Sequence, residues 1–422
     1  MKKLSLFLIV SLLSTVITGC KIQYVEEETT TEENIVETVS EATLEDISIN
    51  FWYYDESYTT YLKACEKDYE AANKNIDVKL VLAEEAGYMD ALVRNTMSED
   101  DAIDLYMIDN DALEQASLAG ITKENTMSDI FSKYNYSEKA ISACTYKDEL
   151  VAYPLSYNTL FLLYNKMYIA ENIPANFAAI KAYADTFEDS VGTVRSIFSC
   201  DLNEVFYNYG FLGGVLEIGG TDGDDKTKQF KVTDKVMEAV EEYKNLIAFF
   251  SIDIESVDFY SCVNDFENGR TIYTVADVEM LNRINNDIAE KSLPLDYGVL
   301  PFLDYNDNCA TSPLSVTTSV AVNPFSKNIE IAESFAKYVT FTNASELMKM
   351  TGYPACRNLD NMSEYEQQMY YSYDKSTPKL KIMYSDEFYA LLEVTMHLMA
   401  NDEDDVQALS AVSGYLEEQW SE

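Results

Sequence analysis

In the first part of the chain, hydrophobic residues follow two patterns: short runs typical of strands, and a spacing of three and four residues typical of a helix. Residues 47–53 are rich in β-forming side chains, and the same holds for residues 78–82 and 103–109. Between the first two segments, apolar residues recur three and four positions apart, at Tyr58, Tyr61, Leu62, Cys65, Tyr69 and Ala72. That spacing predicts a helix with one buried face. Strands that alternate with helices are typical of βαβ units, so the pattern predicts an α/β fold with a mainly parallel sheet.

The same alternation continues further along. Strands are predicted at residues 152–164, 271–275 and 316–322, and helices at residues 234–250 and 326–339. The C-terminal third is mainly helical. The stretch from about residue 47 to residue 422 is too long for one ordinary hydrophobic core, which predicts two domains.

The N-terminus carries a targeting signal. Lys2 and Lys3 precede an apolar run, Leu4 to Val16, which is shorter than the ~20 residues that a membrane-spanning helix needs. This order is typical of a secretory signal peptide at residues 1–19. The run ends in Ile17-Thr18-Gly19-Cys20, which resembles a bacterial lipobox with Ile17 in place of the usual leucine. By that resemblance Cys20 becomes the lipid-modified first residue of the mature protein. The alternative is an ordinary cleaved signal in which the cysteine is incidental.

Residues 20–46 contain an acidic, threonine-rich stretch, residues 26–33, and little apolar surface. Such a segment cannot offset the entropy of ordering, so we expect a disordered tether. About 25 flexible residues reach roughly 25–30 Å, enough to hold a domain above a membrane.

Composition narrows the choice of partners. The formal net charge of −43 excludes nucleic-acid binding, because phosphates would be repelled. Tyrosine is abundant, with Tyr 32 against Trp 2, and aromatic faces can stack on sugar rings. The six cysteines after Cys20 show no CxxC spacing, so the sequence predicts no metal site and no cofactor, and their pairing stays open.

Several separated segments resemble the maltodextrin-binding type of extracellular solute-binding protein. Residues 147–154, KDELVAYP, and 160–166, LFLLYNK, are similar to that family's "GK-aliphatic-A-Y-P" strand and "L-x-YNK" segment. Further similarities lie at Asp104 with 109–111, 266–271, 297–301, 326–335 and 352–355. Together they span nearly all of the mature chain. Two departures are Asp277, where the family usually has glycine, and the near absence of the family's pocket tryptophans.

The resemblance implies a two-lobed, periplasmic-binding-protein-like (Venus flytrap) α/β fold. The lobes would be joined by crossover strands near residues 156–159, 297–301 and 323–327. It divides the chain into lobe 1 at 47–156 and 298–323, and lobe 2 at 157–297 and 324–422, the latter with the C-terminal helices. Closure of the lobes about a few hinge residues would bury a small ligand between them.

The function implied is that of a lipid-anchored protein on the outer face of the bacterial cytoplasmic membrane. It would capture a small ligand, most simply a sugar or oligosaccharide, as a monomer and deliver it to the permease subunits of an ABC importer. The chain contains no GxxxxGK[ST] motif, so a partner subunit would have to hydrolyse ATP.

Candidate ligand-binding residues are polar or aromatic side chains at the ends of predicted strands, where open α/β sheets bind ligands. They are Trp52, Tyr54, Asp55, Asp109, Asn110, Tyr157, Asn158, Asp277, Glu279 and Tyr353. The alternative for each is packing within a lobe or plain exposure.

A surface-anchored carbohydrate-active enzyme is the competing hypothesis. Glu84 with Glu85, or Asp109 with Asp111, could in principle act as a pair of catalytic carboxylates. With 73 acidic residues, however, such pairs arise by chance. The single histidine, His397, is not accompanied by a GxSxG motif. The segment Asp222–Asp225 lacks the spacing of a calcium loop and is predicted to be a polar turn.

Overall fold

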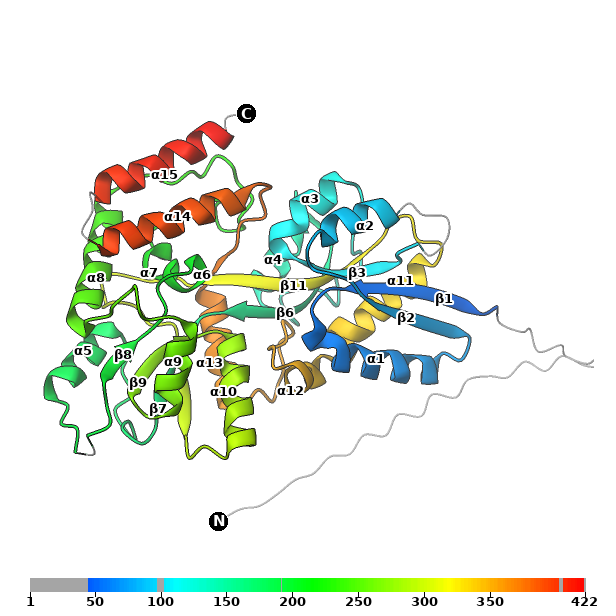
Figure 1. Cartoon of the computed structure of the whole chain (residues 1–422). Helices are drawn as coiled ribbons and strands as arrows, with labels where there is room; N and C mark the ends of the chain where they lie inside the picture. Colours follow the sequence, from blue (N-terminus) through cyan, green and yellow to red (C-terminus); the bar gives the residue numbers. More distant parts are fainter. Residues whose placement is uncertain (1–44, 97–101, 191, 402–404, 421–422) are drawn as a thin grey trace, which may run out of the picture. The chain divides into compact units, whose positions relative to one another are not determined.

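The computed structural model describes residues 45–96, 102–190, 192–401 and 405–420 (Figure 1). The predicted signal peptide, Cys20 and nearly all of the predicted tether lie outside the described residues. In the described part of the chain, no helix combines the length and the apolar character needed to cross a membrane.

The first lobe is built on a mixed sheet with strand order β12-β11-β3-β1-β2, in which β6 also pairs with β11. Its strands are β1 (Ile47–Tyr53), β2 (Ile76–Leu82), β3 (Leu105–Asp109), β6 (Tyr153–Thr159), β11 (Leu314–Val322) and β12 (Thr377–Pro378). Strand β1 runs parallel to β2 and β3, whereas β11 runs antiparallel to β3 and β6. The sheet is therefore mixed and not mainly parallel, because β11 returns from the second lobe in the opposite direction.

Helices surround this sheet. They are η1 (Glu56–Tyr58), α1 (Thr59–Ala72), α2 (Tyr88–Thr96), η2 (Asn110–Ala112), α3 (Leu113–Leu118), α4 (Glu138–Ala143), α11 (Ile329–Lys337), the π-helical η3 (Tyr338–Thr342), η4 (Ala344–Glu346) and α12 (Leu347–Thr351). A small hairpin, β4 (Thr145–Tyr146) with β5 (Glu149–Leu150), follows α4.

The second lobe contains a sheet of order β10-β7-β9-β8. Its strands are β7 (Phe161–Asn165), β8 (Ser196–Ser199), β9 (Thr271–Ala276) and β10 (Tyr297–Pro301). Its helices are α5 (Phe177–Thr186), α6 (Val205–Asn208), α7 (Gly210–Gly213), α8 (Asp234–Phe250), α9 (Phe259–Glu267), α10 (Val278–Lys291), α13 (Glu364–Lys375), α14 (Ser385–Ala400) and α15 (Asp405–Trp420). In Figure 1 the strands and most helices of this lobe lie on the left and those of the first lobe on the right.

Local periodicity explains the elements that the sequence predicted best. Helix α1 buries Tyr61, Leu62, Cys65 and Tyr69, the positions that recur at helical spacing. In β1 the buried Ile49, Phe51 and Tyr53 alternate with more exposed neighbours, as one face of a strand requires. The predicted strand at 152–164 is instead two strands, β6 and β7, separated at Leu160. The chain passes from the first sheet to the second at Leu160, directly after the predicted crossover at 156–159, whose residues still pair with β11 in the first sheet.

The other two predicted crossovers are displaced. Residues 297–301 form β10, which pairs along its whole length with β7 in the second sheet, so the chain crosses only between β10 and β11. Residues 323–327 do not cross at all. The backbone N–H of Asn323 donates to the carbonyl of Asp104, and Ser326 donates to the Asp104 carboxylate, which ties this segment to β3.

The chain returns to the second lobe later, between Cys356 and α13. The Cys356 N–H still bonds to the Leu155 carbonyl of β6, whereas Tyr365 on α13 donates to the Tyr297 carbonyl of β10. The predicted lobe boundaries at 298 and 324 therefore differ from the structure. Residues 297–301 belong to the second sheet, and residues 324–356 pack on the first.

Candidate functional site

The first half of the site lies where β1 and β3 end side by side. Tyr54 follows β1, and Asp109 is the last residue of β3. The Tyr54 hydroxyl donates to Asp109 Oδ2 over 2.6 Å, and Thr318 Oγ1 on β11 donates to Asp109 Oδ1 over 2.7 Å. Asp55 begins η1, with its carboxylate accepting from the Ser57 N–H. The predicted residues at these two strand ends are therefore neighbours, as adjacent parallel strands require.

A cavity of about 420 Å³ opens beside Tyr54 and Asp109. Its wall consists of Tyr54, Glu85, Gly87, Tyr88, Met89, Asp90, Ile108, Asp109, Asp111 and Ala112. The Tyr54 and Tyr88 rings lie 5.0 Å apart. Carboxylates and tyrosine rings thus share one concave surface at the edge of the first lobe.

Burial makes Asp109 an unusual acid. Burial first, and then the neighbouring Asp111 carboxylate, raises the pKa of Asp109 to about 6, although hydrogen bonds from Tyr54 and Thr318 work in the opposite direction. Asp111 itself is paired with Lys379, with Nζ 2.6 Å from Oδ2. A charged carboxylate that is buried beside a second carboxylate lowers the stability of the folded protein. Carboxylates with a raised pKa are typical of functional sites.

The second half of the site lies at the start of α10. Asp277 caps this helix by accepting from the Met280 N–H over 2.9 Å, and it also accepts from the Tyr207 hydroxyl over 2.9 Å. Asn158, just before the first crossover, donates to Asp277 Oδ2 over 3.2 Å. In return, the Val278 N–H donates to Asn158 Oδ1 over 3.1 Å. Asn158 and Asp277 therefore connect β6 of the first lobe to the helix that carries the exposed Glu279.

Tyr353 lies between these two halves. Its half-buried ring stacks on Tyr58, with centroids 5.3 Å apart and planes at 16°. Burial raises the pKa of the Tyr353 phenol, and four carboxylates raise it further, namely Asp55, Asp277, Glu279 and Asp109. Two of these belong to the first lobe and two to the second. Four predicted carboxylates, two from each lobe, therefore influence this one predicted tyrosine.

Three predicted residues pack or form hydrogen bonds within the protein. Tyr157 is only 2% exposed and stacks on Tyr373 with centroids 4.0 Å apart, so its ring lies in the core. Asn110 is 1% exposed, and both ends of its side-chain amide form hydrogen bonds within the protein. The amide oxygen accepts from the Thr317 N–H, and the amide nitrogen donates to the Lys379 carbonyl. Trp52 is partly buried and packs against the hydrophobic cluster of Tyr88 and Leu92, which is the lobe-packing alternative.

Several residues around the site were not among the predicted candidates. Tyr58, Tyr88, Asp111 and Tyr207 all contact or line it. Asp111 could have been chosen from the sequence, because it stands two positions beyond the end of β3, where a ligand-binding residue is expected. Tyr207 had none, because it lies on a four-residue helix, 70 residues from the Asp277 that it binds.

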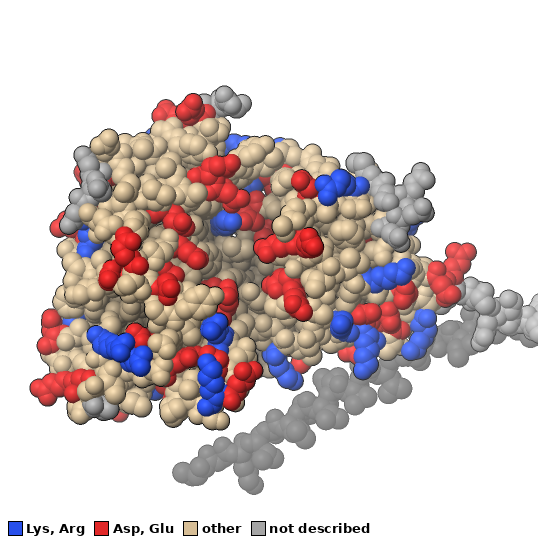
Figure 2. Space-filling model, viewed as in Figure 1, with Lys and Arg blue, Asp and Glu red and all other residues tan. Residues whose placement is uncertain are grey.

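Acidic side chains dominate the surroundings. Figure 2 shows Asp and Glu side chains around the hollow in the middle of the face in view. Among the described residues that line the cavity at Asp109, none is Lys or Arg. No group of three or more His, Cys, Asp or Glu side chains in the described ranges is arranged to hold a metal ion. The six cysteines from Cys65 to Cys356 are free thiols.

Residues 64–361 match the family of bacterial extracellular solute-binding proteins. The chain belongs to this family. Its members are binding proteins, so this solute-binding protein acts by binding and not as a carbohydrate-active enzyme. Its family also places it outside the cytoplasm.

Solved structures confirm the two-lobed fold of this solute-binding protein. An extracellular solute-binding protein from Staphylococcus aureus in complex with maltose is 16% identical and has a TM-score of 0.76, covering 88% of this chain and 97% of its own. A maltose-binding periplasmic protein from Listeria monocytogenes is 19% identical with a TM-score of 0.73, covering 89% and 98%. A maltotriose-binding protein from Thermus thermophilus is 19% identical with a TM-score of 0.67, covering 88% and 99%. A search of curated proteins found no match.

Proposed function

We propose that this protein captures an oligosaccharide between its lobes, as a monomer, and delivers it to the permease of an ABC importer. The observation that carries the proposal is the placement of tyrosine rings beside polar groups: Tyr54 donates to Asp109 in the wall of the cavity, and the half-buried Tyr353 stacks on Tyr58. A sugar ring offers hydroxyls at its edge and apolar C–H groups on its face. Carboxylates accept from the hydroxyls, and a tyrosine ring covers the face.

The similar structures support this ligand class. The Staphylococcus aureus and Listeria monocytogenes proteins were solved with maltose, and the Thermus thermophilus protein with maltotriose. The whole sequence has Tyr 32 and only Trp 2, so tyrosine rings are the aromatic surfaces that this chain chiefly offers to a sugar. We therefore propose a smaller stacking surface and a larger share of hydrogen bonding in the binding energy.

Calorimetric titration with maltose, maltotriose and maltotetraose tests the proposal. At 100 times its Kd, a bound ligand should add about 2.7 kcal/mol of stability, which thermal melting detects. Tyr353→Ala should weaken binding of the best ligand by roughly tenfold or more, because a central aromatic contact is lost. Tyr134→Ala is the matched control, since this ring is 85% exposed and should leave binding unchanged. If no oligosaccharide shifts the melting temperature, the proposed ligand class is wrong.

We also propose that the protein is held at the outer face of the membrane by lipid on Cys20. The basic residues, the apolar run and the lipobox-like Ile17-Thr18-Gly19-Cys20 support this. Mass spectrometry of the detergent-extracted protein should find an acylated N-terminal cysteine. Cys20→Ser should release the protein into the medium or leave its signal peptide uncleaved. Cleavage at another site, with Cys20 unmodified or absent, would contradict the proposal.

A further inference from the structure

The cavity beside Asp109 offers a ligand hydrogen-bond acceptors and no free side-chain donor. Its lining includes four carboxylates, those of Glu85, Asp90, Asp109 and Asp111. Of the other side chains that line it, only those of Tyr54 and Tyr88 carry a hydrogen to donate. Both hydrogens are used within the protein. Tyr54 donates to Asp109 Oδ2 over 2.6 Å. Tyr88 donates to the Trp52 carbonyl over 3.1 Å.

Three of the four carboxylates have no cationic partner to balance them. Asp111 is the exception, because its Oδ2 lies 2.6 Å from Lys379 Nζ. Within the described ranges, no Lys or Arg side chain forms an ion pair with Glu85, Asp90 or Asp109. Salt screens charges that are more than about 8 Å away at physiological ionic strength. The charge of the wall itself therefore decides which ligand charge is favoured here.

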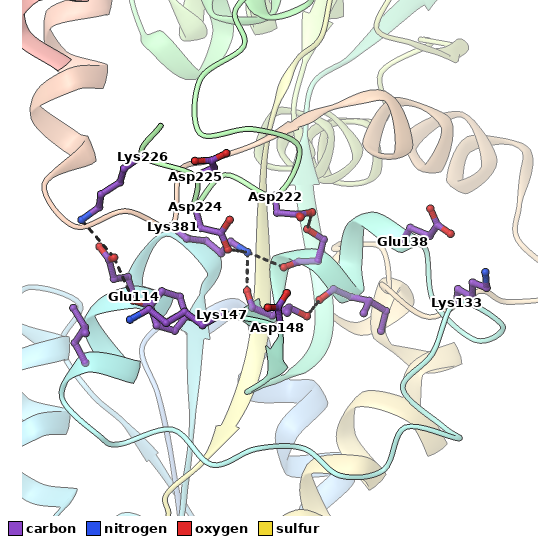
Figure 3. A pocket seen from close by; sticks show the side chains of 15 residues that line it. Glu114, Lys133, Glu138, Lys147, Asp148, Asp222, Asp224, Asp225, Lys226 and Lys381 are labelled. Atoms are coloured by element: carbon purple, nitrogen blue, oxygen red, sulfur yellow. Dashed lines mark hydrogen bonds and ion pairs between the residues drawn. The ribbon is translucent and has the colours of Figure 1, made fainter. Parts of the chain in front are cut away.

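A larger groove shows that the acidity of the whole chain does not force this arrangement. The Asp222–Asp225 segment forms a polar turn, as predicted, and lines a groove of about 970 Å³ (Figure 3). Lysines balance the acids of this groove. Lys226 Nζ lies 3.6 Å from Glu114 Oε1, and the buried Lys381 has its Nζ 3.1 Å from Asp224 Oδ2. The unbalanced carboxylates are thus a local property of the cavity beside Asp109.

Two aromatic rings in the same wall also favour a cation. The Tyr54 and Tyr88 rings lie 5.0 Å apart with their planes at 56°, and both line the cavity. The face of such a ring attracts an ammonium group within about 6 Å of its centroid. An ammonium group has three donors and no acceptor, which matches a wall of acceptors. Its hydrogen bonds to carboxylates are charge-assisted and about twice as strong as those of a neutral hydroxyl.

The second lobe adds negative charge on its own side of the site. Burial first, and then the Asp277 carboxylate, raises the pKa of Glu279, although Arg283 acts in the opposite direction. Asp55 of the first lobe raises the pKa of Glu279 further. Like charges therefore act on each other across the two lobes, and a positively charged ligand reduces this repulsion.

We propose that the cavity beside Asp109 binds the ammonium group of a basic sugar, so that the ligand of this protein is an oligosaccharide of amino sugars. This inference rests on the proposed function and deepens it by naming the class of sugar. It also excludes acidic sugars, because a uronate carboxylate has only acceptors and would meet carboxylates in the wall.

Two β-1,4-linked trisaccharides test the inference directly. The trimer of glucosamine carries an ammonium group at carbon 2 of each ring, where cellotriose carries a hydroxyl, and the two are otherwise alike. In calorimetric titration at pH 6.5 the glucosamine trimer should bind roughly tenfold or more tightly than cellotriose, because its hydrogen bonds are charge-assisted. Trigalacturonate should not bind. Equal or weaker binding of the glucosamine trimer would overturn the inference.

Removing one charge from the wall should reduce the preference between these two ligands. Asp109→Asn and Glu85→Gln each replace a carboxylate by an amide of similar shape. In each variant the ratio of the two Kd values should fall by roughly threefold, as expected for one partly exposed charge pair. Asp148→Asn is the matched control, because Asp148 is exposed and lines the larger groove instead. A merely structural effect would weaken both ligands alike, so an unchanged ratio in both wall variants would overturn the inference.

Maltotetraose and spermidine separate this inference from the proposed function. If maltotetraose or cellotriose binds as tightly as the glucosamine trimer, the protein captures sugars and the ammonium site is wrong. If spermidine binds and no sugar does, the ligand is a polyamine, which overturns the proposed function and the amino-sugar class together. Tightest binding of the glucosamine trimer, with weaker binding of the neutral sugars and none of trigalacturonate, is the result expected.

Discussion

Tyr157→Ala should lower the free energy of unfolding by about 3–5 kcal/mol, because it removes a large buried side chain from a packed core. The ring is 2% exposed and stacks face to face on Tyr373. Phenylalanine keeps this ring and removes only the hydroxyl. We therefore expect Tyr157→Phe to change stability by less than about 1 kcal/mol.

Denaturant unfolding beside calorimetric titration checks this prediction. The folded fraction of Tyr157→Ala should bind ligand with wild-type affinity, since Asn158, the next residue, faces the site and Tyr157 does not. A variant that keeps its stability and loses binding would show that the ring contacts ligand. That outcome would restore the role that the sequence alone suggested for Tyr157.

Asp109→Asn should separate stability from function. The raised pKa of Asp109, about 6 against about 3.9 in an unfolded chain, means that the folded protein holds the proton more tightly. Between pH 4 and 6 the folded state therefore binds more protons than the unfolded state. The contribution of this group to stability falls as pH rises through that window, and its cost is fully present above pH 6.

Asparagine cannot ionise, so the variant escapes this cost. We expect Asp109→Asn to be more stable than wild type by about 1–3 kcal/mol at pH 7, and nearly equal to it at pH 4. Its amide oxygen can still accept from Tyr54 or Thr318. Ligand affinity at pH 7 should nevertheless fall roughly 5- to 100-fold, because a charged acceptor at the site is lost.

Thermal melting from pH 4 to pH 8 checks the predicted change in stability, and calorimetric ligand titration at pH 7 checks the predicted change in affinity. Asp68→Asn is the control, since this carboxylate is exposed on α1. A stability difference between Asp109→Asn and wild type that does not vary with pH would contradict the assigned pKa. Wild-type affinity in the variant would show that Asp109 does not contact ligand.

Local sequence patterns determined the elements whose formation depends on near neighbours. The helical spacing from Tyr61 to Tyr69 predicted α1, because residues three and four apart share one face whatever surrounds the helix. The short apolar runs at 47–53 and 103–109 predicted β1 and β3. The sequence also put Tyr54 and Asp109 at the ends of two predicted strands, and the pairing of β1 with β3 makes those ends neighbours.

The two-lobed architecture came from the family resemblance of separated motifs, whereas the crossovers in the structure lie beside or away from the three segments that the resemblance implied. Residues 323–327 look like a boundary because a helix follows a strand there. The hydrogen bonds of Asn323 and Ser326 to Asp104, more than 200 residues away, instead keep this segment on the first lobe. Such long-range contacts leave no periodic trace in the sequence.

The tertiary structure alone decided which candidates lie close together and which are buried in the core. Tyr157 and Asn158 are adjacent in β6, and successive side chains of a strand point to opposite faces. The pairing of β6 with β11 sends Tyr157 into the core and leaves Asn158 to meet Asp277. Tyr353 and Tyr58 likewise stack only because two distant segments fold against each other. Sequence periodicity determines which residues share a face of one element, whereas the packing of the elements determines what that face meets.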